Sequence, residues 1–152
     1  MKVELFSVTD APRMRCAIEV RTEVFVIEQA VPAELEIDDH DRTDLDAVHI
    51  LLTEGSQTFA AGRFYRNEFG DAQIGRMAVR KSARGRGLGR LMLEALVSEA
   101  RAQGYRRVSL HAQVHAIDFY RKAGFSESGD YFEDAGIEHQ EMSKQLLTPP
   151  SP

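Results

Sequence analysis

The feature that most constrains the chain is the stretch RKSARGRGLGR at residues 80–90, which contains five basic residues, three glycines and no acid. It follows a run of strand-forming residues that ends near Val79, and apolar residues at helical spacing begin at Leu88. The first turn of a helix has unpaired backbone N–H groups and the positive end of the helix dipole, and glycines let a phosphate approach the main chain. The sequence therefore predicts a phosphate-binding turn between a strand and a helix.

Two common phosphate-binding loops do not fit this turn. A P-loop requires Gly-x-x-x-x-Gly-Lys followed by Ser or Thr, and no lysine lies among these glycines. A dinucleotide fingerprint requires Gly-x-Gly-x-x-Gly and an acidic residue about 20 positions later. Here the spacing is Gly-x-Gly-x-Gly, and Tyr105 is followed by Arg106 and Arg107. The motif is therefore neither a P-loop nor a dinucleotide fingerprint, but a third kind of phosphate-binding turn.

The charge of the chain limits the classes of partner. The formal net charge is -5, so the positive charge of residues 80–90 is local. An acidic balance argues against nucleic acid or an anionic membrane as the main partner, and no aromatic residues alternate with the arginines as a stacking surface for RNA. No uninterrupted apolar run approaches the roughly 18 residues that cross a bilayer. We expect no nucleic-acid partner and no membrane partner.

Size and cysteine content favour one cytoplasmic domain. The 152 residues, 43% of them hydrophobic, suit a single core, which we expect to span residues 1–147, followed by a proline-rich disordered tail at 148–152. The lone Cys16 cannot form an internal disulfide, and the charged start of the chain lacks the apolar core of a signal peptide. Both observations favour a reducing compartment.

Periodicity predicts a mixed α/β layer fold of order β-α-β-β-β-α-β-α-β. The expected strands are 3–8, 47–53, 58–65, 72–79, 107–112 and 141–147. Thr9-Asp10, with Pro12 in the first turn, is an N-cap signal for the first helix, whose apolar positions run from 14 to 25, and the other expected helices are 88–103 and 116–123. The three strands between 47 and 79 suggest an antiparallel meander, because turn residues separate them. Residues 32–46 hold seven acids and few large apolar residues, which predicts a loop.

Several segments resemble the GNAT superfamily of N-acetyltransferases. Arg84-Gly85-Arg86-Gly87-Leu88-Gly89 matches its acetyl-CoA signature, Gln/Arg-x-x-Gly-x-Gly/Ala, and a second family block follows as AIDFYRKAGF at 116–125. Three further segments are similar to the ElaA/YjcF-like subgroup: VFVIEQ at 24–29, LHAQ at 110–113 and GIEHQEM at 136–142. The resemblance extends over nearly the whole chain.

This resemblance implies a fold, a co-substrate and its binding residues. The fold is a mixed, mostly antiparallel central sheet flanked by helices, with splayed fourth and fifth strands. The co-substrate is acetyl-CoA, whose pantetheine arm contacts the backbone of Met77, Ala78 and Val79. The pyrophosphate is bound by main-chain N–H groups of Arg84, Gly85, Arg86, Gly87, Leu88, Gly89 and Arg90, assisted by the side chains of Arg84 and Arg86; the alternative is a solvated basic turn. The resemblance also allows a homodimer.

For catalysis, the resemblance implies that Tyr120 is a general acid that protonates the departing CoA thiolate; the alternative is a core aromatic side chain. The acceptor amine must lose a proton before it attacks, and the fourth strand offers no obvious base. His111 at the end of the fifth strand and Glu28 are the candidates. The alternatives for these two are a structural histidine and a salt bridge at a helix end. His49 and His139 are interpreted as structural, although His139 can line the acceptor site.

The predicted function is acetyl transfer from acetyl-CoA to an amine by direct attack. The alternative is a CoA-binding sensor or interaction module with little catalysis, because no base is evident. We expect no metal site, since the adjacent residues Asp38-Asp39-His40-Asp41 cannot all converge on one ion. The acidic loop instead offers a way to attract a cationic amine.

Overall fold

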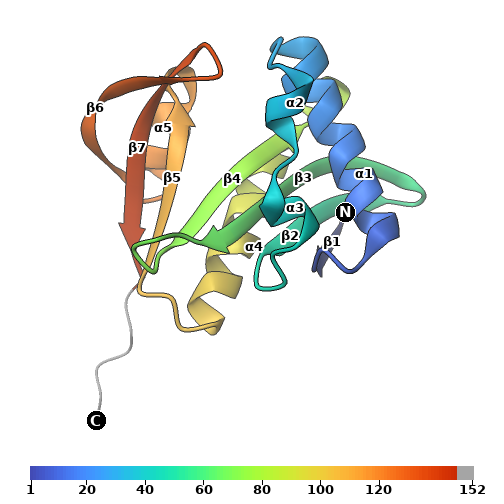
Figure 1. The fold of residues 1–152 in the computed structure, drawn as a ribbon, viewed down its shortest axis with the longest axis horizontal. Helices are drawn as coiled ribbons and strands as arrows, with labels where there is room; N and C mark the ends of the chain where they lie inside the picture. Colours follow the sequence, from blue (N-terminus) through green and yellow to red (C-terminus); the bar gives the residue numbers. More distant parts are fainter. Residues whose placement is uncertain (147–152) are drawn as a thin grey trace.

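The structure, a computed structural model, describes residues 1–146, and the tail expected at 148–152 lies outside the described residues (Figure 1). Seven strands form one sheet: β1 (Lys2–Phe6), β2 (Val48–Glu54), β3 (Gln57–Arg66), β4 (Ala72–Val79), β5 (Arg107–Gln113), β6 (Ser126–Asp134) and β7 (Ile137–Gln145). The longer helices are α1 (Ala11–Arg21), its π-helical continuation η1 (Thr22–Glu28) and α4 (Leu88–Ala102). The short helices are α2 (Ala33–Glu36), α3 (Asp39–Arg42), η2 (Lys81–Ala83), η3 (Val114–Ala116) and α5 (Ile117–Lys122).

The sheet has the strand order β1-β2-β3-β4-β5-β7-β6, and among the described strands only β4 and β5 run parallel. These two strands pair only over Ala72–Ile74 and Val108–Leu110. Beyond those residues they diverge, as Figure 1 shows. The expected mixed, mostly antiparallel sheet with splayed fourth and fifth strands is confirmed.

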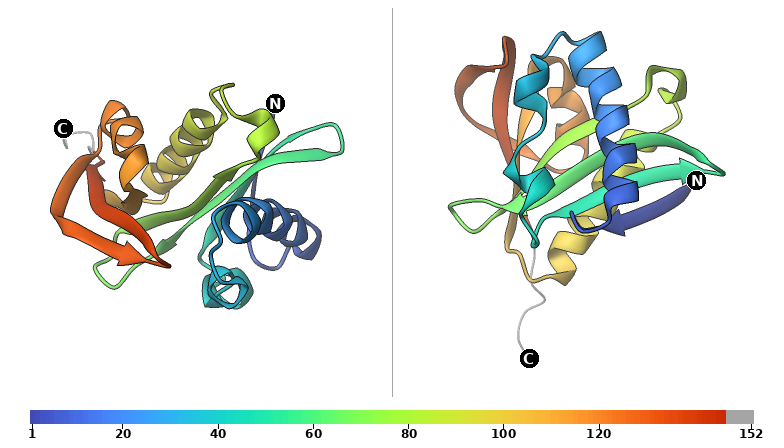
Figure 2. Two further views of the ribbon diagram at one scale, coloured as in Figure 1. Left: turned by 90° about the horizontal axis from the view of Figure 1, so that it is seen from above. Right: turned by 45° about the vertical axis from the view of Figure 1, so that its right-hand side comes forward.

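Helices cover both faces of the sheet and close two apolar clusters. Figure 2 shows α1 on one face and α4 with α5 on the other. The larger cluster lies under α4, whose buried face includes Leu88, Met92 and Leu96 at helical spacing. The smaller cluster packs α1 against the opposite face of the sheet. None of the helices in residues 1–146 has the length and apolar content to cross a membrane.

The sequence-based prediction missed one strand and misplaced several boundaries. β6 was not predicted because it is an edge strand with most of its side chains exposed, so it has no hydrophobic alternation. The last strand begins at Ile137 rather than at 141. The predicted cap of the first helix at Thr9-Asp10 is confirmed: the helix begins at Ala11, and the Asp10 side chain accepts a hydrogen bond from the Arg13 N–H.

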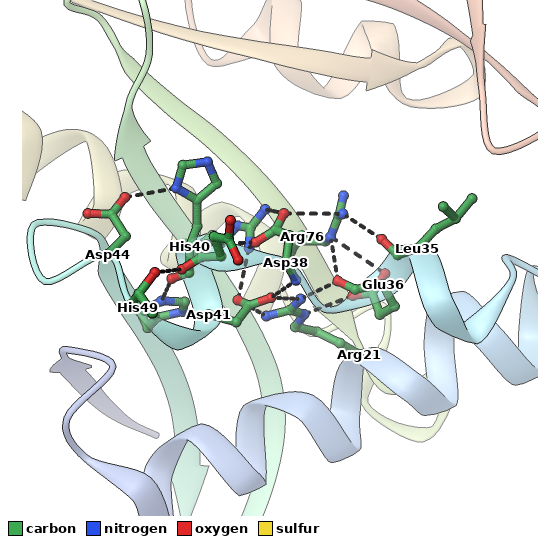
Figure 3. Close-up of polar contacts among 12 residues, drawn as sticks. Arg21, Leu35, Glu36, Asp38, His40, Asp41, Asp44, His49 and Arg76 are labelled. Carbon is green, nitrogen blue, oxygen red and sulfur yellow. Dashed lines mark hydrogen bonds and ion pairs between the residues drawn. The ribbon is translucent and has the colours of Figure 1, made fainter.

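Residues 32–46 are not a solvated acidic loop, which corrects the prediction. They contain α2 and α3, and two of their carboxylates are buried against a buried arginine of α1 (Figure 3). The Arg21 side chain, 1% exposed, donates to Glu36 at 2.8 Å and to Asp41 at 2.7 and 2.9 Å. Arg63 donates to Asp38 at 2.7 Å and to Asp41 at 2.8 Å. The charges of Glu36, Asp38 and Asp41 are therefore balanced by arginines within the fold and are not free to attract a cationic amine, while Glu34, Asp39 and Asp46 stay exposed.

Asp41 is expected to be the most important of these carboxylates for stability. Burial opposes its ionisation, but hydrogen bonds from Arg21 and the charges of Arg21 and Arg63 outweigh burial and lower its pKa. Asp41→Asn should reduce the free energy of unfolding at pH 7 by about 3–5 kcal/mol, because it leaves buried guanidinium groups without their partner. The exposed Asp39→Asn is the matched control, and urea unfolding measures both.

The pH dependence of this loss has a definite sign. Because the folded-state pKa of Asp41 lies below that of the unfolded chain, the unfolded state binds the proton more readily and wild-type stability falls as the pH drops. The difference in the free energy of unfolding between wild type and Asp41→Asn should be largest near neutral pH and should shrink below about pH 4. A difference that grows on acidification would contradict this account.

Candidate active site

The glycine-rich turn forms an open main-chain cradle at the start of α4. Gly85 and Gly87 have φ values of +82° and +75°, which favour glycine, and Gly87 immediately precedes the first residue of the helix. Within the described chain, no side chain caps this helix end. A Cβ added to either glycine would have no atom of residues 1–146 within 4 Å. The turn therefore offers backbone N–H groups and free space, which fit a pyrophosphate.

Gly89 has a different role from the two glycines before it. An added Cβ there would lie 3.5 Å from the Phe119 ring, so this glycine sets how closely α4 and α5 approach. The arginines of the turn have acidic neighbours, with Arg86 3.5 Å from Glu54 and Arg90 2.9 Å from Glu94. Their positive charge is thus partly neutralised, and the main chain is the stronger candidate for recognising phosphate.

Arg84, the first residue of the signature, is bound to Glu28 at the end of η1. Two hydrogen bonds of 2.6 and 2.7 Å join the guanidinium to the carboxylate, and the Arg84 Nε donates to the Val79 carbonyl at 3.1 Å. The hydrogen bond from Arg84 lowers the pKa of Glu28. A carboxylate with a lowered pKa is a weaker base, so this geometry favours the salt-bridge interpretation of Glu28 over the catalytic one.

A cleft of about 750 Å³ opens where β4 and β5 diverge. Its walls come from η1, α2, β3, β4, β5, η3, α5, β7 and the turn between β6 and β7. The cleft brings together the following residues singled out from the sequence: Glu28, Met77, Ala78, Val79, Arg84, His111 and Tyr120. Residues 85–90 do not line it and form the adjoining turn.

Tyr120 presents its hydroxyl to this cleft from α5. The oxygen lies 4.0 Å from the Met77 sulfur, and the ring packs edge-on against Phe119 and Phe125. Burial raises the pKa of Tyr120 to about 12. The phenol therefore carries its proton at neutral pH and can donate it, while its ring also packs against the core. The acid interpretation applies to the hydroxyl and the core-aromatic interpretation applies to the ring, so the two are compatible.

A β-bulge in β4 shapes the same wall of the cleft. Ala61 pairs with Ala78, and Arg63 pairs with Gly75. One residue of β3 therefore lies opposite two residues of β4, so β4 carries one extra residue. Arg76 lies in this bulge with a φ of +51°, which is uncommon for a residue with a side chain. The bulge changes the direction of the side chains and backbone groups that border the diverging strands.

Three histidines line the cleft: His111, His115 and His139. His111 follows Leu110, the last β5 residue paired with β4, and is edge-on to the Phe132 ring at 5.0 Å. The buried His139 was interpreted as structural, yet it also lines the cleft. Its Nδ1 lies 2.7 Å from the Ile137 carbonyl and donates to it, which leaves Nε2 as the acceptor in a neutral ring. The one sequence signal for His139 was its place in the subgroup-like segment 136–142.

His49 fits its structural interpretation. It is buried away from the cleft, and its Nε2 is 3.0 Å from the His40 carbonyl, while burial lowers its pKa. Among residues 1–146, no group of three or more His, Cys, Asp or Glu side chains has the arrangement of a metal site.

A family profile described as "Acetyltransferase (GNAT) domain" matches residues 14–146. The chain belongs to the GNAT acetyltransferase family. The uncharacterized N-acetyltransferase YjcF of Bacillus subtilis strain 168 is 39% identical over 133 residues, which cover 87% of this chain and 92% of YjcF.

Solved structures agree with this family. An acyl-CoA N-acyltransferase from Pseudomonas aeruginosa superposes with a TM-score of 0.85 at 28% identity, covering 94% of this chain and 98% of the other. Escherichia coli ElaA, at 24% identity, shares the fold with a TM-score of 0.84, covering 94% of this chain and 98% of ElaA. The protein is an acyl-CoA-dependent N-acyltransferase of the ElaA/YjcF-like kind. This membership favours the enzyme over the CoA-binding sensor.

Proposed function

We propose that this GNAT enzyme transfers the acetyl group of acetyl-CoA to an amine by direct attack of the amine on the thioester. The observation that carries the proposal is the junction of the glycine cradle with the cleft. Arg84 lines the cleft and immediately precedes Gly85, so the open glycine turn adjoins the cleft that Tyr120 also lines, and we take the two as one path. This path suits a long substrate with a pyrophosphate at one end and a thioester at the other.

The roles along this path follow from the chemistry of each wall. The N–H groups of residues 84–90 bind the pyrophosphate, and the backbone of Met77, Ala78 and Val79 binds the pantetheine arm. A backbone N–H near Val79 polarises the thioester carbonyl. As the C–N bond forms and the C–S bond breaks, Tyr120 donates its proton to the CoA thiolate. In this proposal Glu28 holds Arg84 in place through their ion pair.

Direct attack is supported by the position of the single cysteine. Cys16 is half-buried on α1, packs against the smaller apolar cluster and is absent from the lining of the cleft. A thiol in that place has no route to the thioester, so no covalent acetyl-cysteine is needed. We place the reaction in the cytoplasm, without a nucleic-acid or membrane partner, since the chain is acidic and its one thiol is unpaired.

We propose His111 as the base that accepts the proton of the amine, with His139 as the second candidate. Replacing the true base with glutamine should lower kcat/KM by roughly 10²-fold and remove the acidic limb of the pH–rate profile, because imidazole changes charge between about pH 5 and 8. The other variants should keep that limb. Profiles of His111→Gln and His139→Gln measure this, with His115→Gln as a third variant because His115 also lines the cleft. An unchanged limb in all three variants would exclude a histidine base.

The function is tested by mixing the protein with acetyl-CoA and a panel of amines and by following the release of CoA thiol. The panel contains a polyamine, an amino sugar, an amino acid, a peptide with a free N-terminus and a lysine derivative. Amine-dependent release is expected for at least one class. Acetyl-CoA binding without amine-dependent release for any of them would favour the sensor and contradict the proposal.

A further inference from the structure

The guanidinium of Arg76 borders the cleft beside α2, where its nitrogens contact the backbone carbonyls of Leu35 and Glu36. Arg76 lines the cleft, its side chain is 29% exposed, and the next residue, Met77, faces the Tyr120 hydroxyl. The backbone holds it at a φ of +51°, a conformation that costs about 1 kcal/mol or more for a residue with a Cβ. A strained backbone that directs a permanent cation to the edge of a reaction site calls for a functional explanation.

Arg76 makes longer contacts with the neighbouring acids than Arg21 and Arg63 do; Figure 3 shows Arg21 and Arg76 on either side of Glu36. The Arg76 nitrogens are 3.5 Å from a Glu36 carboxylate oxygen and 3.7 Å from an Asp38 oxygen, and 3.2 Å from the carbonyls of Leu35 and Glu36. The same carboxylates have bonds of 2.7 to 2.8 Å to Arg21 or Arg63. The acids are thus already satisfied, and the Arg76 fork retains donor capacity for a ligand.

A second donor at this side of the cleft lacks a partner. Arg63, 3% exposed, lines the cleft, and its Nε has no hydrogen-bond acceptor among the described residues. Buried N–H groups are rarely left unpaired in folded proteins, so such a group marks a place for water or a ligand oxygen. Arg21, Arg63 and Arg76 also balance the three carboxylates Glu36, Asp38 and Asp41, so these acids add no net negative charge beside Arg76.

We propose that Arg76 recognises an anionic group on the acceptor, so that the substrate of this enzyme is an amine that also carries a carboxylate or a phosphate. A planar guanidinium binds either group through two parallel N–H···O bonds. The bound anion positions the amine at its other end toward the thioester beside Met77 and Tyr120. This inference rests on the proposed acetyl transfer and adds to it the chemical class of the acceptor.

The test uses three acceptors of equal length that differ in the charge of the end remote from the reacting amine. These are 5-aminopentanoate, 5-aminopentanamide and 1,5-diaminopentane. The wild-type kcat/KM should be highest for the anionic probe. Arg76→Gln should lower that value by roughly 10- to 100-fold, the loss expected for charge-assisted hydrogen bonds, and change the amide by less than about threefold. Phosphoethanolamine compared with ethanolamine separates a phosphate requirement from a carboxylate requirement.

Two controls separate recognition from structural support. Arg76→Lys keeps the charge without the planar fork and should recover only part of the preference. Arg15 is an exposed arginine of α1 with no described partner, and Arg15→Gln should leave all three probes unchanged. The melting temperature and the KM for acetyl-CoA are measured for each variant. If Arg76 were merely structural, its replacement would change both of these quantities and would lower kcat/KM for every acceptor.

The outcomes distinguish this inference from the proposed function. A wild-type preference for the amide or the diamine, or an equal loss for all three probes in Arg76→Gln, would overturn the anionic acceptor while acetyl transfer stands. Transfer to no amine of any charge, with acetyl-CoA binding intact, would overturn the proposed function and this inference with it. A loss of kcat/KM in Arg76→Gln that is selective for the anionic probe supports both the proposed function and the anionic acceptor.

Discussion

Replacing Tyr120 with phenylalanine is expected to lower kcat by 10²- to 10⁴-fold, the usual contribution of a general acid, while the affinity for acetyl-CoA changes by less than about twofold. The ring of Tyr120 packs against Phe119 and Phe125, and phenylalanine preserves that packing. The substitution removes the hydroxyl, which faces the cleft 4.0 Å from the Met77 sulfur. Steady-state kinetics with acetyl-CoA titration measure both quantities.

The loss of kcat in Tyr120→Phe should be the same across the pH range of the assay. Burial raises the pKa of Tyr120 to about 12, so the wild-type acid stays protonated at every pH at which the amine reacts. Tyr131→Phe is the matched control, because Tyr131 is an exposed tyrosine of β6, 55% accessible and outside the cleft. A kcat that is unchanged in Tyr120→Phe would remove Tyr120 from the mechanism and leave it as a core aromatic.

Gly87→Glu is expected to weaken acetyl-CoA binding by at least roughly 100-fold. The substitution places a carboxylate in the space that a pyrophosphate would occupy at the start of α4, and it forces a side chain onto a backbone with a φ of +75°. Titration calorimetry measures the Kd. Lys81→Ala, which removes a charge from the same stretch but no glycine, should change the Kd by less than about threefold.

A matched glycine separates the cradle from backbone strain. Gly104 also has a positive φ, +88°, and a Cβ added there likewise has no described atom within 4 Å, but it lies beyond the opposite end of α4. Gly104→Glu should therefore cost a similar amount of stability, about 1–2 kcal/mol, without weakening acetyl-CoA binding. Equal losses of affinity in Gly87→Glu and Lys81→Ala would mean that charge alone, rather than the cradle, recognises the substrate.

Features encoded by neighbouring residues were predictable from the sequence. The cradle is one, since Gly85 and Gly87 themselves permit the left-handed backbone that opens the turn. The apolar face of α4 is another, because its period is visible within a single segment. β6 was not predictable in this way, since an edge strand with exposed side chains carries no alternation.

Features built from distant residues were not predictable. The acids of residues 32–46 looked like a solvated loop because their partners, Arg21 and Arg63, come from α1 and β3 and meet them only in the folded chain. The bulge at Arg76 depends on how β4 pairs with β3, which the sequence of β4 alone does not specify. The bulge and the buried ion pairs beside the cleft therefore emerged only from the structure, whereas the glycine turn was visible in the sequence.

The most direct test of direct transfer follows the fate of the acetyl group itself. Isotope-labelled acetyl-CoA is incubated with the protein, with and without an amine that supports thiol release, and the products are analysed by mass spectrometry. The account predicts one acetylated amine for each CoA thiol released and no labelled protein in either sample. Label on Cys16 of the protein, or labelled acetate in place of acetylated amine, would contradict it.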